Sequence, residues 1–111
     1  MLIFAVDGDP VMLETLHGAI AKAEPEALIM DFRRGTEALA ALDGKGAVPD
    51  VVFTEIELEG MDGLCFAARM RQKAPRVKLV FVTGDPRYAA DAYRIHANGY
   101  VIKPVDEIRI R

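Results

Sequence analysis

The sequence contains one cysteine, Cys65, and neither serine nor tryptophan. A single cysteine excludes an internal disulfide and a zinc site built from several thiolates. The absence of serine removes serine nucleophiles and argues against a hydrolase of that class. We interpret Cys65 as a small buried residue of a helix, and the lack of disulfides fits a cytoplasmic protein.

Long hydrophobic runs and blocks of basic residues are also missing. No apolar stretch reaches the length of a membrane span, and the opening MLIFAV lacks the basic leader and cleavage pattern of an export signal. The net charge is -3, from 17 acidic and 14 basic residues without a basic cluster. We therefore expect a cytoplasmic domain with no membrane anchor and no direct nucleic-acid binding by this segment.

The apolar residues that are present suffice for one compact core. With 111 residues and 51% hydrophobic content, the chain is expected to form a single domain, residues 1–111. Short continuous runs of Val, Ile, Leu and Phe are typical of strands buried on both faces of a sheet. Five such strands are predicted: 2–6, 27–32, 51–53, 77–82 and 100–102. Because Met30 and Asp31 interrupt the second, we expect it nearer an edge of the sheet.

Apolar residues at helical spacing lie between these strands. The first predicted helix begins at Asp9 and Pro10 and ends before Pro25, and the second is capped by Thr36 and stops at Gly44. Two further helices are predicted over 63–73 and 86–96. In the third, Phe66, Ala67 and Met70 share a face, and in the fourth Ala89, Ala92, Tyr93 and His96 recur at helical intervals. Alternation of strand and helix predicts a doubly wound α/β fold with a parallel sheet.

Only seven residues, 105–111, follow Pro104. They can form at most two helical turns. We therefore expect a truncated last helix and a chain that is the N-terminal part of a longer protein. Apolar sheet surface left without cover favours association, so we expect a homodimer.

Polar residues follow four of the predicted strands at their carboxyl ends, where binding sites lie in open parallel sheets. They are Asp7, Gly8 and Asp9; Thr54 and Glu55; Thr83 and Gly84; and Lys103 and Pro104. Each residue alone could be a helix cap, a strand-end residue or a solvated charge. Together they place carboxylates, a hydroxyl and a lysine at one edge.

Four motifs carry a resemblance to a known family: AVDGDPVMLETL, PDVVFTEIELEGMDG, VFVTGDPRYA and ANGYVIKP. With them the chain resembles the receiver domains of two-component response regulators, over nearly its whole length. The resemblance implies a flavodoxin-like (CheY-like) sheet of order 2-1-3-4-5. It also implies a non-enzymatic role in phosphorelay signalling, a sensor histidine kinase as partner and an attached output domain, expected to bind DNA and regulate transcription. The stretch YAADAYRIHANGYVIKP is similar to receivers joined to LytTR-type DNA-binding domains.

The resemblance also assigns roles to individual positions. It places Asp7 in the acidic metal pocket, Glu55 at the phosphoacceptor position, Thr83 and Tyr100 as switch residues and Lys103 as the phosphate-sensing lysine. In such a pocket a carboxylate takes a phosphoryl group from phosphohistidine, Mg²⁺ neutralises the phosphoryl oxygens, and lysine and threonine bind the product.

The sequence departs from this family pattern at three positions. Glu55 replaces the usual aspartate, and its extra methylene shifts the carboxylate by roughly 1 Å, which can cost about a hundredfold in an in-line transfer. Gly8 replaces the second metal-binding acid, so that Mg²⁺ would depend on Asp7, Glu55 and the backbone carbonyl of Glu57, and we expect low affinity. Asp9 is counted with Asp7 in the acidic pocket, but it lies one residue too far along to replace the missing acid, and its better role is helix cap. Glu59 replaces a loop proline.

Three interpretations of the pocket stay open. Glu55 could pair with Lys103 and reach Thr83, partly imitating a phosphorylated aspartate; the pocket could be inert; or residual phosphorylation could remain. At the level of the whole domain, the alternatives to a working receiver are a phosphorylation-independent interaction module and a small enzyme acting on a phosphorylated substrate. His17 and His96 are interpreted as packing or surface residues, because neither has a second ligand at metal spacing.

Overall fold

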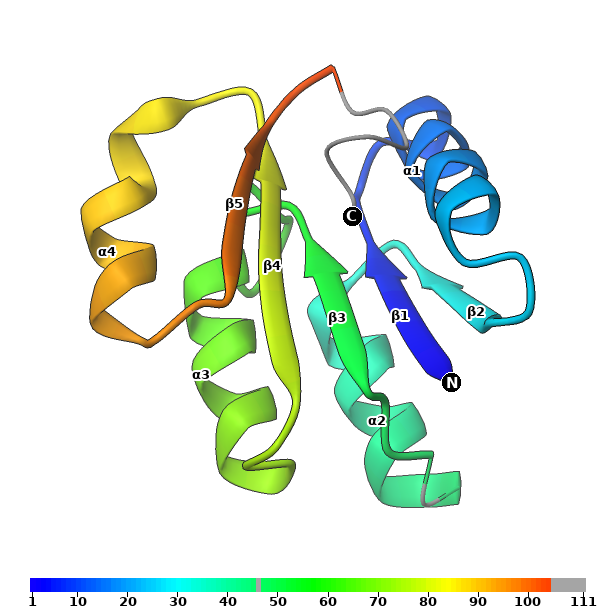
Figure 1. Cartoon of the computed structure of the whole chain (residues 1–111). Helices are drawn as coiled ribbons and strands as arrows, with labels where there is room; N and C mark the ends of the chain where they lie inside the picture. Colours follow the sequence, from blue (N-terminus) through cyan, green and yellow to red (C-terminus); the bar gives the residue numbers. More distant parts are fainter. Residues whose placement is uncertain (46, 105–111) are drawn as a thin grey trace.

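The computed structural model describes residues 1–45 and 47–104. Five parallel strands form one sheet in the order β2-β1-β3-β4-β5, with helices on both sides of the sheet (Figure 1). The strands are β1 (Leu2–Val6), β2 (Leu28–Phe32), β3 (Val51–Thr54), β4 (Lys78–Thr83) and β5 (Gly99–Ile102). This confirms the predicted fold class and strand order. The turns expected after Pro104 lie outside the described residues.

Burial along each strand follows its place in the sheet. In β1 every residue after Leu2 is buried, and in β3 every residue after Val51, as expected for strands covered on both faces. The strand β2 has no fully buried residue, and it lies at the edge as the Met30 and Asp31 interruption predicted. Thr54 and Thr83 prolong β3 and β4 beyond the predicted apolar runs, because both threonines continue the strand pairing.

Helices cover both faces of the sheet. They are α1 (Pro10–Ala23), α2 (Gly35–Lys45), α3 (Gly63–Lys73), a 3₁₀ turn η1 (Pro86–Tyr88) and α4 (Ala89–Arg94). One core cluster joins α1 to the sheet and includes Leu13, Leu16 and Ile20. A second, larger cluster joins α2, α3 and α4 to the opposite face and includes Phe66 and Met70. No helix in the described part is long and apolar enough to cross a membrane.

The predicted start and stop of α2 are wrong. The helix begins at Gly35 instead of being capped by Thr36, and it continues through Gly44 to Lys45. A Cβ at Gly35 would lie 3.0 Å from Phe66, so the first turn of α2 packs closely against α3. One helical glycine costs only about 1 kcal/mol, too little to end a helix that is held on the core by Ala38, Leu39 and Leu42.

Three further side chains depart from the sequence prediction. Cys65 is exposed instead of buried, because Phe66, Ala67 and Met70 occupy the inner face of α3. Of the residues predicted at helical intervals in the fourth helix, Ala92 is buried as expected, whereas Tyr93 is 83% exposed. His96 lies beyond the end of α4 in the left-handed region, with φ 58°, so the helix ends earlier than predicted.

Candidate functional site

The buried polar side chains of the described residues gather at the carboxyl edge of the sheet. They are Asp7, Thr54, Glu55 and Thr83, each no more than 7% exposed. The register explains their meeting, because Val6 pairs with Thr54 and Thr83 pairs with Ile102. Each strand therefore delivers its next residue to the same edge, as the sequence predicted.

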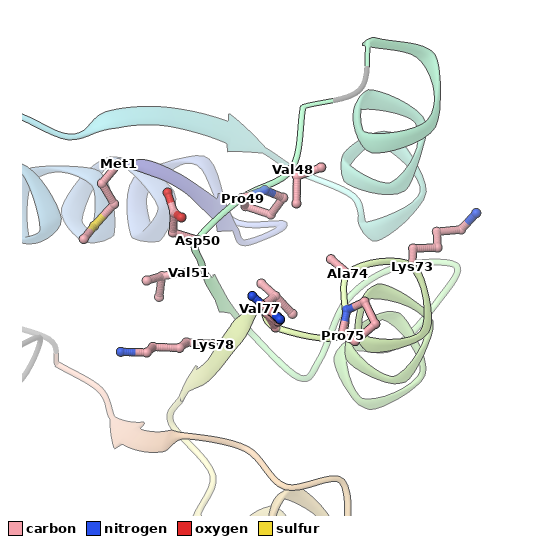
Figure 2. Close-up of a pocket in the computed structure, with 11 residues that line it drawn as sticks. Met1, Val48, Pro49, Asp50, Val51, Lys73, Ala74, Pro75, Val77 and Lys78 are labelled. Carbon is pink, nitrogen blue, oxygen red and sulfur yellow. The ribbon is translucent and has the colours of Figure 1, made fainter.

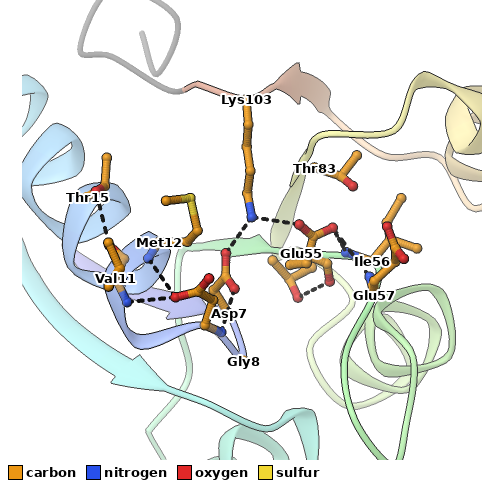
Figure 3. Close-up of polar contacts among 12 residues, drawn as sticks. Asp7, Gly8, Val11, Met12, Thr15, Glu55, Ile56, Glu57, Thr83 and Lys103 are labelled. Atoms are coloured by element: carbon orange, nitrogen blue, oxygen red, sulfur yellow. Dashed lines mark hydrogen bonds and ion pairs between the residues drawn. The ribbon is translucent and has the colours of Figure 1, made fainter.

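Lys103 joins the two carboxylates of this edge. Its Nζ lies 2.8 Å from Oδ2 of Asp7 and 2.7 Å from Oε2 of Glu55. Figure 3 shows the lysine side chain running from the end of β5 to a point between the two acids. Its backbone is positioned by the Lys103 N–H, which donates to the Thr83 carbonyl at 2.9 Å.

Both oxygens of Asp7 have a partner. The Asp9 N–H donates to Oδ1 of Asp7 at 2.9 Å, and Lys103 donates to Oδ2. The Asp7 N–H donates to the carbonyl of Phe32, which fixes the start of the loop against β2. Asp9 caps α1 by accepting from Val11 at 2.9 Å. The cap role predicted for Asp9 is therefore the one it has in the structure.

Both carboxylate oxygens of Glu55 have partners. Oε1 accepts from the N–H of Ile56 at 2.7 Å and of Glu57 at 3.3 Å, while Oε2 faces Lys103. Burial alone would raise the pKa of the Glu55 carboxyl, but hydrogen bonds from Lys103, Thr83 and the Ile56 backbone, with the charge of Lys103, lower it below its ordinary value of 4.5. Neither oxygen is left as a nucleophile without a donor.

The same contacts keep Lys103 charged. Burial would lower the pKa of the ammonium group, but the hydrogen bonds and charges of Asp7 and Glu55 outweigh burial and raise this pKa above its ordinary value of 10.5. The charged Lys103 ammonium group therefore lies between the side chains of Asp7 and Glu55.

This donor set does not fit Mg²⁺. The described residues contain no group of three or more His, Cys, Asp or Glu side chains that could hold a metal ion. Gly8 contributes no side chain, and the carboxylates of Asp7 and Glu55 are both paired with the Lys103 ammonium. Mg²⁺ needs near-octahedral oxygen ligands, and with Gly8 at the position of the second acid this edge offers only the two side-chain carboxylates of Asp7 and Glu55.

The switch residues predicted beside the acids form a connected path. Thr83 Oγ1 accepts from the Asp85 N–H at 3.4 Å, and the Tyr100 hydroxyl donates to the Asp85 carbonyl at 2.5 Å. Burial raises the pKa of the Tyr100 hydroxyl. The path connects Glu55, through Thr83, to the start of η1, where Asp85 also pairs with Arg87.

Two residues of the site were missed by the sequence search. Arg33 donates from Nε and Nη2 to the Gly8 carbonyl at 3.3 and 3.1 Å. It follows β2, the one strand whose carboxyl end the search left out. Gly63 packs against the backbone of the site, because a Cβ there would lie 2.1 Å from the Glu55 carbonyl oxygen.

One open pocket of about 770 Å³ lies away from this site. Its lining comes from the amino ends of β3 and β4 and from the end of α3 (Figure 2). Val51 begins β3 in that pocket, whereas Glu55 follows the other end of the same strand. The pocket therefore has no part in the carboxylate site.

Comparisons with known proteins agree with the fold. Residues 3–111 match the response regulator receiver domain. The chain is 31% identical over 106 residues to the positive alginate biosynthesis regulatory protein of Pseudomonas aeruginosa, covering 95% of this chain and 42% of that protein. It is 34% identical over 107 residues to the DNA-binding transcriptional regulator NtrC of Salmonella typhimurium, covering 95% of this chain and 22% of that protein. The chain thus spans less than half the length of these curated relatives.

Solved structures give the same result. The response regulatory domain of protein mrkE from Klebsiella pneumoniae has a TM-score of 0.87 at 26% identity, covering 99% of this chain and 88% of that one. The Vibrio cholerae chemotaxis protein CheY4 has the same fold, with a TM-score of 0.84 at 19% identity, covering 98% of this chain and 91% of that one. The family match over nearly the whole sequence and the observed sheet order show that the chain belongs to the response regulator receiver domain family.

Proposed function

We propose that this receiver controls an attached output domain through a pocket in which the Glu55 carboxylate takes the place of a phosphorylated aspartate. The observation that carries the proposal is the 2.7 Å contact between Lys103 Nζ and Glu55 Oε2. Lys103 and Thr83 are the positions that bind the phosphoryl group in the family, and here both interact with Glu55. Lys103 and Thr83 therefore have an anionic partner in the Glu55 carboxylate without phosphorylation.

The two departures from the family pattern support a loss of phosphoryl transfer. Glu55 has no oxygen free of donors, and Gly8 supplies no side chain to a metal. A transfer reaction needs a nucleophile aligned with the phosphoryl group and cations around the developing charge. We infer that neither condition is met in the native pocket.

Restoring the family residues tests the first half of the proposal. A Gly8→Asp/Glu55→Asp chain is sterically reasonable at residue 8, since a Cβ there would meet only the Arg33 carbonyl oxygen at 3.7 Å. We expect the native chain to gain no phosphoryl mass from acetyl phosphate with Mg²⁺, and the restored chain to gain it. Equal uptake by both chains would contradict the proposal.

A phosphate mimic tests the second half. Amide chemical shifts of Thr83, Asp85 and Tyr100 should change when beryllofluoride and Mg²⁺ are added to the restored chain, and stay fixed in the native chain. If Glu55 replaces the phosphoryl group, the native shifts should resemble those of the beryllofluoride-bound restored chain. Native shifts that match the free restored chain instead would identify an inert pocket.

We further propose the partners that the family implies. They are a sensor histidine kinase, a DNA-binding output domain of the LytTR class, which the stretch 88–104 supports, and a second copy of the chain. The names of the curated relatives, which include a DNA-binding transcriptional regulator, support a transcriptional output in a cytoplasmic response regulator. A pulldown of the full-length protein with its promoter DNA, in native and Glu55→Gln forms, tests whether the pocket controls this output.

A further inference from the structure

Arg33 lies directly beside the position of the missing acid. It is the first residue after β2, and β2 pairs with β1 up to the contact between Phe32 and Val6. The loop after β1 is fastened there, because the Asp7 N–H donates to the Phe32 carbonyl at 3.1 Å. The Arg33 guanidinium lies against this loop and donates to the Gly8 carbonyl oxygen from Nε at 3.3 Å and from Nη2 at 3.1 Å.

Residue 8 has room for a side chain, so steric exclusion does not account for glycine at this position. A Cβ on Gly8 would meet only the Arg33 carbonyl oxygen, at an ordinary contact distance of 3.7 Å. A carboxylate placed there would start within reach of a guanidinium that already contacts the same residue. Arginine presents a planar fork that binds carboxylates through two hydrogen bonds.

We propose that Arg33 is a metal-excluding residue, which places positive charge on the side of the acidic pocket that Gly8 leaves open. Lys103 places a second positive charge between Asp7 and Glu55. Both carboxylates of the pocket are thus already paired with Lys103, and Arg33 adds a further positive charge beside residue 8, from the end of a different strand. This inference rests on the proposed function, a receiver pocket that works without Mg²⁺.

The size of the effect follows from Coulomb's law. A monovalent and a divalent cation about 6 Å apart in water repel by an energy that corresponds to about a tenfold loss of affinity. Arg33 is exposed, so its charge is screened by solvent and the effect should shrink as salt is added. In a chain with Gly8→Asp, capture of the new carboxylate by the guanidinium adds to this loss.

Mg²⁺ titration by calorimetry tests the proposal in the Gly8→Asp/Glu55→Asp background, at low ionic strength. We expect Arg33→Gln to tighten Mg²⁺ binding about tenfold or more, and Arg33→Lys, which retains the charge, to tighten it much less. Arg34→Gln is the matched control, because Arg34 is in the same loop but its guanidinium faces Glu59, at 3.9 Å. The control should have little effect, and the gain from Arg33→Gln should fall as salt is added.

Equal affinity with Arg33 and with Arg33→Gln, or an equal gain from Arg34→Gln, would overturn the proposal. The same pair of variants in the Glu55→Asp background, which keeps Gly8, provides a second comparison if the triple variant does not fold. The native chain, titrated in parallel, separates this inference from the proposed function. Submillimolar binding by the native chain would contradict the metal-independent pocket, whereas the Arg33 comparison is decided by the variants alone.

Discussion

Lys103 Nζ lies 2.7 Å from Glu55 Oε2, although the strands that carry the two residues are not neighbours. The strand β4 lies between β3 and β5, so the lysine side chain crosses the end of β4 to reach the acid. Thr83, at that end, is fully buried beside the pair. The contact therefore ties three strand ends together and connects the pocket to the loop that contains Asp85.

A double-mutant cycle measures this contact. Lys103→Met leaves Asp7 and Glu55 buried together without a cation, and we expect the free energy of unfolding to fall by about 3–5 kcal/mol. Glu55→Gln keeps an acceptor and leaves Lys103 its bond to Asp7, so we expect a smaller loss of about 1–2 kcal/mol. The double variant should be more stable than the sum of the two losses predicts, by about 1 kcal/mol or more in urea titrations. Additive losses would show that the pair is not coupled.

The pH dependence of stability should identify Glu55. Its pKa is lowered in the folded chain, so its contribution is present above the ordinary value of 4.5 and is lost as the pH falls through the lower folded value. Lys103 has a raised pKa, so its contribution is lost only on the alkaline side, above 10.5. The free energy of unfolding of the native chain should therefore fall more steeply on acidification than that of Glu55→Gln. Parallel curves for the two chains would contradict the assignment.

The sequence predicts most of this site because the site is built from strand ends. Continuous apolar runs locate the strands, and parallel pairing then brings the following residues, Asp7, Glu55 and Lys103, to one edge. The side-chain contacts within the site are harder to predict from the sequence. Lys103 contacts both Asp7 and Glu55 because its side chain extends across the end of β4. The position of Arg33 depends on the pairing of β2 with β1.

The errors came from local rules that packing overrode. Gly44 is a common helix stop, but α2 continues through it because the helix is packed on the core. Cys65 is a residue type that is often buried, yet it is exposed, because Phe66, Ala67 and Met70 occupy the inner face of α3. Propensity gives the type of each element, whereas its ends and its outer face depend on neighbours that are distant in sequence.

Self-association remains a prediction of the sequence, and the described residues suggest a surface for it. Val51, Val80 and Val101 are only partly buried on the sheet face that α1 covers in the described part of the chain. We expect light scattering to give a dimer mass at high concentration, because such apolar surface is stabilised by association. Val101→Lys should shift the mass toward the monomer. A monomer mass for the native chain at high concentration would contradict the prediction.

Gly63 should be the least replaceable glycine near the site. A Cβ there would lie 2.1 Å from the Glu55 carbonyl oxygen and 2.7 Å from Ile56 Cα, so the backbone that bears the carboxylate must move. We expect Gly63→Ala to lower the free energy of unfolding by about 1–3 kcal/mol and to shift the amide resonances of Glu55 and Ile56. Gly18→Ala is the control: it lies within α1 with no atom within 4 Å of its Cβ, and should stabilise the chain by about 0.5–1 kcal/mol. Because both changes add one methyl group to a helix, equal effects would show that the close approach of Gly63 to Glu55 does not position the carboxylate.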